Sequence, residues 1–63
     1  MLTDRQTIIL TMLSNGHHEK TIASYLGVSV NTVKAHTAVI RRKLGATNKT
    51  AAVAKAWRAG LIQ

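Results

Sequence analysis

The apolar residues of the chain recur at helical spacing in four segments, and a glycine follows each segment. Apolar positions three and four residues apart place one face of a helix against a core. The glycines are suited to end these helices because glycine adopts the left-handed backbone conformation without strain. The pattern predicts one all-α, four-helix bundle-like domain over residues 1–63, with helices at about residues 4–14, 19–26, 30–44 and 48–59.

Polar residues mark the predicted helix starts. Thr3 is followed three residues later by Gln6, the spacing of a capping box in which each side chain accepts a hydrogen bond from the other residue's backbone. Ser29 and Asn48 are favourable N-caps for the third and fourth helices. These signals support four separate helices rather than one continuous amphipathic segment.

The core is expected to be small and aliphatic, since aromatic residues make up only 3% of the chain. Its predicted members are the apolar stripes of the four helices. These are Ile9, Leu10, Met12 and Leu13; Ile22, Ala23 and Leu26; Val30, Val33, Thr37, Ile40 and Leu44; and Val53, Ala56, Trp57 and Leu61. A core of this size predicts marginal stability, which oligomerisation would raise.

The third predicted helix carries a second, polar face opposite its apolar stripe. This free face consists of Asn31, Ala35, Ala38 and Arg42, with Lys34 and Arg41 along one edge and His36 and Lys43 along the other. Its small side chains would let the helix enter a DNA major groove about 12 Å wide, where an Asn amide can bind adenine through two hydrogen bonds. The flanking cations would then contact phosphates.

The charge balance agrees with a polyanionic partner. Nine Lys and Arg residues stand against two acids, for a formal net charge of +7. Charge alone does not separate DNA from an anionic membrane, but a membrane-active protein would present one continuous amphipathic surface. A short helix, a tight turn at residues 27–29 and a longer basic helix together predict a helix-turn-helix. We expect no membrane contact.

Several motifs at matching spacing resemble the LuxR-type (GerE-type) helix-turn-helix domain of bacterial transcription regulators. They are "LTDRQ", "KTIA", "SVNTVKAH", "IRRKLG", "KTAAV" and "GLI", which together cover nearly the whole chain. The resemblance implies a regulator domain, often joined to a sensory or phosphoacceptor domain, that binds DNA as a dimer. The pattern begins at Leu2, directly after Met1, which fits either a free-standing domain or part of a longer regulator.

The resemblance also implies DNA contacts at Lys34, Ala35 and Ala38, with support from Thr32 and the helix start. Combined with the free face and its cations, the predicted DNA-binding set is Ser29, Asn31, Thr32, Lys34, Ala35, Ala38, Arg41, Arg42 and Lys49. The family usually has Glu at the positions of Gln6 and Thr21 and Arg at Lys49. We interpret these departures as the loss of a structural polar network.

The fourth helix carries the predicted dimer contact. Family resemblance places the contact on this helix, and its exposed strip would be Thr50, Ala54, Trp57 and Leu61. Trp57 is therefore a candidate for both roles, with the core favoured over the interface. The strip is short, so we expect a weak homodimer that assembles on DNA.

Other chemistry is not supported by the sequence. His17 and His18 are adjacent and face different directions, which argues against a metal site. Asp4 and Glu19 are the only acids, and no nucleophile and base are paired, so we expect neither an enzyme nor a cofactor. The lack of cysteine is compatible with the cytoplasm, the expected location. The main alternative function is a helix-turn-helix that contacts RNA polymerase or another regulator.

Overall fold

The computed structural model describes residues 1–63 and contains four helices. They are α1 (Asp4–Ser14), α2 (Glu19–Leu26), α3 (Val30–Leu44) and α4 (Lys49–Arg58). The all-α prediction is confirmed, and α4 is one residue shorter at each end than predicted because Asn48 and Ala59 are its caps. The longest helix has 15 residues, and none has the apolar length needed to cross a membrane.

The predicted N-caps are all present. At α1, Gln6 N donates to Thr3 Oγ1 over 3.1 Å and Thr3 N donates to Gln6 Oε1 over 3.0 Å, which completes the capping box. The Ser29 hydroxyl accepts from Thr32 N over 3.1 Å, and Asn48 Oδ1 accepts from Ala51 N over 2.8 Å. Each bond satisfies a backbone N–H that the helix itself cannot pair.

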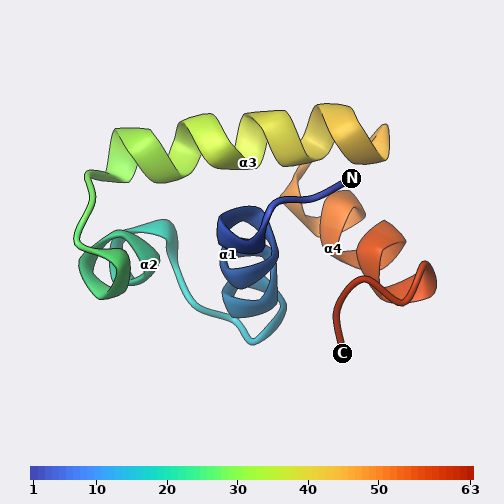
Figure 1. Ribbon diagram of the computed structural model, residues 1–63, viewed down its shortest axis with the longest axis horizontal. Coiled ribbons are helices and arrows are strands. Elements are labelled where there is room, and N and C mark those ends of the chain that lie inside the picture. Colours follow the sequence, from blue (N-terminus) through green and yellow to red (C-terminus); the bar gives the residue numbers. More distant parts are fainter.

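The helices are arranged so that α3 lies along one side of the molecule (Figure 1). The other three helices all lie on the same side of α3, with α1 between α2 and α4 (Figure 1). The chain enters α3 through Gly27, whose φ of 70° makes the left-handed turn after α2. One face of α3 is therefore packed against the rest of the protein, and the opposite face has no helix over it.

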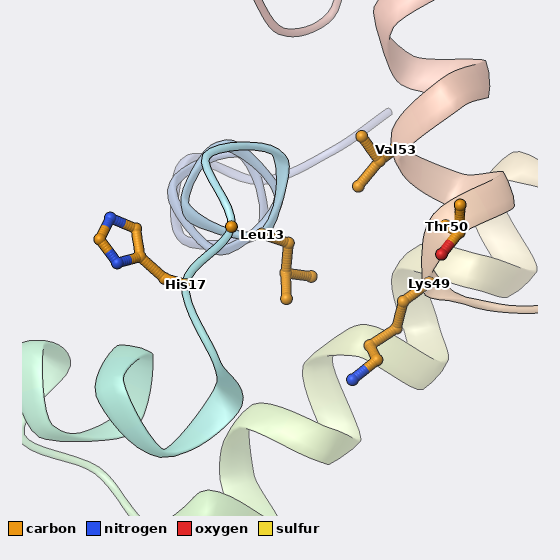
Figure 2. A pocket seen from close by; sticks show the side chains of 6 residues that line it. Leu13, His17, Lys49, Thr50 and Val53 are labelled. Atoms are coloured by element: carbon orange, nitrogen blue, oxygen red, sulfur yellow. The ribbon is translucent and has the colours of Figure 1, made fainter.

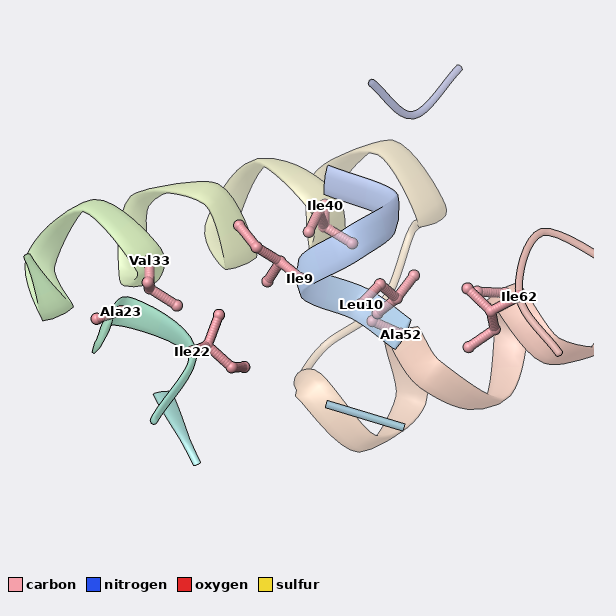
Figure 3. Packing of buried hydrophobic residues seen from close by; sticks show 9 residues of the cluster. Ile9, Leu10, Ile22, Ala23, Val33, Ile40, Ala52 and Ile62 are labelled. Carbon is pink, nitrogen blue, oxygen red and sulfur yellow. The ribbon is translucent and has the colours of Figure 1, made fainter. Parts of the chain in front are cut away.

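The core joins all four helices around α1. Ile9 and Leu10 of α1 are completely buried, as are Ile22 of α2 and Val33 of α3 (Figure 3). Ile40 continues the α3 contribution and is 1% exposed. Burial of each such side chain contributes about 1.5–3 kcal/mol relative to exposure, so α3 is anchored mainly by its inner stripe.

The prediction that Trp57 belongs to the core is wrong, since its side chain is 59% exposed. The buried positions of α4 are Ala52 and Ala56, which are four residues apart on one face. Trp57 follows Ala56 and is rotated by about 100° away from that face. The chain then turns at Gly60, and the buried Ile62 fills the core beside α4 (Figure 3).

Candidate nucleic-acid interface

The free face of α3 is open to solvent at three of its four positions. Asn31, Ala35 and Arg42 are exposed, and Ala38 is half-buried. The opposite side of the helix buries Val33, Thr37 and Ile40. Because each residue is rotated by about 100° from the one before, the residues that anchor α3 in the core lie on one side of the helix, and the residues open to solvent lie on the other.

The start of α3 adds two hydroxyl groups to this face. Ser29 Oγ and Thr32 Oγ1 are 3.0 Å apart, and both residues are exposed. Their hydrogen bonds fix the first turn of α3, so the position of Asn31 between them is well defined. The predicted site residues at the helix start therefore lie together.

One edge of the free face borders a polar cleft. The cleft lies between α3 and the starts of α2 and α4, and is lined by Glu19, Lys34, Thr37, Arg41, Asn48 and Lys49. Lys49 Nζ lies 3.7 Å from Glu19 Oε1, and Arg41 Nη1 donates to the Thr47 carbonyl oxygen over 3.4 Å. The fold thus brings the predicted phosphate-binding cations Lys34, Arg41 and Lys49 to one side of α3.

The opposite edge differs from the prediction because Lys43 is engaged within the protein. Its Nζ donates to Gln6 Oε1 over 2.8 Å and to the Met1 carbonyl oxygen over 2.9 Å. This ammonium holds the N-terminal segment against α3, so it is not a free phosphate contact. His36, on the same edge, is half-buried.

Gln6 bonds to Lys43 and not to Thr21 or Lys49, so the loss of the polar network that would join these three positions stays an interpretation. Gln6 is 6% exposed, and its Oε1 accepts from both Thr3 N and Lys43 Nζ. An amide oxygen therefore makes these bonds without a carboxylate, and Lys49 is paired with Glu19. Gln6 and Lys43 are 37 residues apart in the chain, and local sequence pattern holds no signal for such a pair.

A second hollow lies between the end of α1 and the start of α4. It is lined by Leu13, Gly16, His17, Lys49, Thr50 and Val53. In Figure 2 the Leu13 side chain points toward α4, whereas the His17 ring points away from Lys49. His18 is the N-cap of α2 but makes no side-chain capping bond. The two histidines therefore do not converge with Lys49 on one site.

The predicted dimer strip is partly exposed. Thr50 and Trp57 are exposed, and Ala54 and Leu61 are half-buried. Trp57 is the largest of these side chains and lies on the outer surface of α4. An exposed aromatic ring on a helix surface is available for contact with another protein surface.

Comparison with known proteins identifies the family. Residues 1–56 match the family described as "Bacterial regulatory proteins, luxR family". The transcriptional regulatory protein YdfI of Bacillus subtilis is 41% identical over 61 residues, which cover 97% of this chain and 29% of YdfI. The response regulator protein VraR of Staphylococcus aureus is 38% identical over 63 residues, which cover 100% of this chain and 30% of VraR.

Solved structures show the same fold. The transcription factor GerE superposes with a TM-score of 0.94 at 29% identity, covering 98% of this chain and 92% of GerE. The Vibrio cholerae VqmA dimer, solved in the absence of its target DNA, gives a TM-score of 0.93 at 31% identity, covering 100% of this chain and 29% of VqmA. The sequence match, the shared fold and the uncovered basic face of α3 agree, and the chain belongs to the luxR family of bacterial regulatory proteins.

Proposed function

We propose that this chain binds double-stranded DNA with sequence specificity, as a domain of a transcription regulator, and that α3 enters the major groove. The observation that carries the proposal is the slim free face of α3, which is uncovered and lies beside a cluster of cations. The chain spans about 30% of the length of the curated relatives YdfI and VraR, both named as regulators. The regulatory role of any larger protein is part of the proposal.

The site residues divide into two groups by chemistry. Asn31, Ala35, Ala38 and Arg42 face the bases, because the free face is the side of α3 that can approach the groove floor. The second group lies where the backbone of a DNA strand would pass. It consists of Ser29 and Thr32 at the start of the free face, and of Lys34, Arg41 and Lys49 along one edge. Phosphate contacts position the helix, and base contacts provide specificity.

Selection of bound duplexes from a random pool, at low salt, tests this function directly. Wild-type protein is expected to enrich one base pattern. Asn31→Ala is expected to relax the preference at one base pair, at a cost of about 1–3 kcal/mol, if the amide reads adenine. The same pattern from both proteins would show that Asn31 is not a base reader. Failure of the wild type to bind any duplex would favour the alternative, a helix-turn-helix that contacts RNA polymerase or another regulator.

We further propose that two copies assemble weakly through α4. Trp57 would provide the main apolar contact, and Thr50, Ala54 and Leu61 would surround it. A two-fold axis through this contact would direct two copies of α3 to half-sites about 10 bp apart in an inverted repeat. The patch is small, so the free protein is expected to be mainly monomeric at micromolar concentration.

Ala54→Lys is expected to remove cooperative binding to a duplex with two half-sites and to leave binding to one half-site unchanged. The half-buried Ala54 lies within the strip, and two lysines related by symmetry would repel each other there. Gel-shift titration on the two duplexes measures the effect, and circular dichroism checks the fold. Undiminished cooperativity would place the dimer contact elsewhere.

A further inference from the structure

We infer that the cleft between α2, α3 and α4 binds one phosphate of the DNA backbone, and that Lys49 exchanges Glu19 for that phosphate. The inference deepens the proposed function and rests on it. The cleft has a volume of about 290 Å³ and no apolar residue in its lining. Three cations and one acid line it, so its charge favours an anion.

Arg41 carries unused hydrogen-bonding capacity at this cleft. Its Nε is buried and has no hydrogen-bond partner, and the guanidinium makes only the long bond from Nη1 to the Thr47 carbonyl oxygen, at 3.4 Å. Buried polar atoms are nearly always paired, so we expect the guanidinium to turn toward an acceptor that enters the cleft. A phosphate oxygen is such an acceptor, because the guanidinium fork matches its geometry.

Lys49 is held loosely by its protein partner. The distance of 3.7 Å to Glu19 is longer than that of a charge-assisted hydrogen bond, and half of the Lys49 side chain is exposed. Figure 2 shows this side chain extending away from α4. A pair of this kind contributes little to stability, so the ammonium can leave the carboxylate for a phosphate at small cost.

The backbone at the cleft favours the same ligand. Asn48 is the N-cap of α4, Lys49 is its first residue and Glu19 begins α2, so two helix N-termini border the cleft. Each has N–H groups without helical partners and a partial positive charge. Lys34 lies both in the cleft lining and on the edge of the free face, so a DNA strand beside the major groove would pass over the cleft.

In this arrangement Glu19 opposes DNA binding. Its carboxylate occupies Lys49 in the free protein and would repel the phosphate in the complex. Glu19→Gln is therefore expected to tighten binding to a selected half-site duplex by about threefold or more, whereas Lys49→Met is expected to weaken it by about tenfold. Arg58→Met removes an exposed cation at the far end of α4 and serves as the matched control, with no effect expected.

The decisive measurement uses half-site duplexes in which one phosphate at a time is replaced by an uncharged methylphosphonate. The tenfold effect of Lys49→Met is expected to disappear on one of these duplexes and to persist on the others. An equal reduction on every duplex, or weaker binding by Glu19→Gln, would overturn the phosphate assignment. If wild-type protein binds the unmodified duplex in that case, the proposed function stands; if it binds no duplex, both proposals fail.

Discussion

Ala35→Glu is expected to abolish binding to duplex DNA and to leave the helical content of the protein unchanged. Ala35 is exposed near the middle of the free face, and no other part of the chain covers it. Glutamate there would prevent close approach to the groove floor and would bring a carboxylate beside phosphates. Juxtaposed like charges cost several kcal/mol across an interface, and each step of about 1.4 kcal/mol is tenfold, so affinity should fall by about a hundredfold or more.

The same substitution at Ala59 provides the control. Ala59 is exposed and caps the C-terminal end of α4, so Ala59→Glu makes the same change of charge away from α3. Gel-shift titration on a selected half-site, with circular dichroism for both variants, gives the comparison. Retained affinity in Ala35→Glu, or equal reductions in the two variants, would mean that α3 does not enter the groove through this face.

Binding is expected to weaken about 10³- to 10⁵-fold between about 50 and 200 mM salt. Each phosphate that a cation neutralises releases counterions, and about 6–10 such phosphates produce a reduction of this size. Lys34, Arg41 and Lys49 lie beside the free face of each chain, so a dimer bound to two half-sites would neutralise about six phosphates. Affinity measured across a salt series tests the prediction.

Single substitutions assign this salt dependence to residues. Lys34→Ala is expected to weaken all duplex sequences about equally and to reduce the slope of log affinity against log salt by about one unit for each phosphate that is no longer neutralised. Arg58→Ala, at the end of α4, should leave the slope unchanged. A flat salt titration of the wild-type protein would contradict the assignment of these cations to phosphates.

The helices could be predicted closely because their signals are local. Thr3, Ser29 and Asn48 start helices through bonds that span three residues, and the apolar stripe of α3 repeats within the helix itself. The free face followed from the same periodicity. A residue's side of a helix depends on its own position and that of its near neighbours, both of which are visible in the sequence.

The errors involve packing between elements. Trp57 is large and apolar, yet the close approach of α4 is made by two alanines. The pattern predicted the burial of Ala56 but missed Ala52, because a small side chain gives only a weak hydrophobic signal. The bond from Lys43 to Gln6 and the pairing of Lys49 with Glu19 join segments far apart in sequence. The partner of each side chain depends on how the helices pack against each other, and the periodicity of one helix carries no information about that packing.

The separation of α3 into a packed side and an open side has an evolutionary consequence. Asn31, Ala35 and Arg42 are exposed and hold no other element in place, whereas Val33, Thr37 and Ile40 are buried against the rest of the protein. Exposed substitutions usually change stability by less than about 0.5 kcal/mol. Duplicated copies of such a gene can therefore diverge toward different operators through changes on the open side, while selection for folding acts on a separate set of codons.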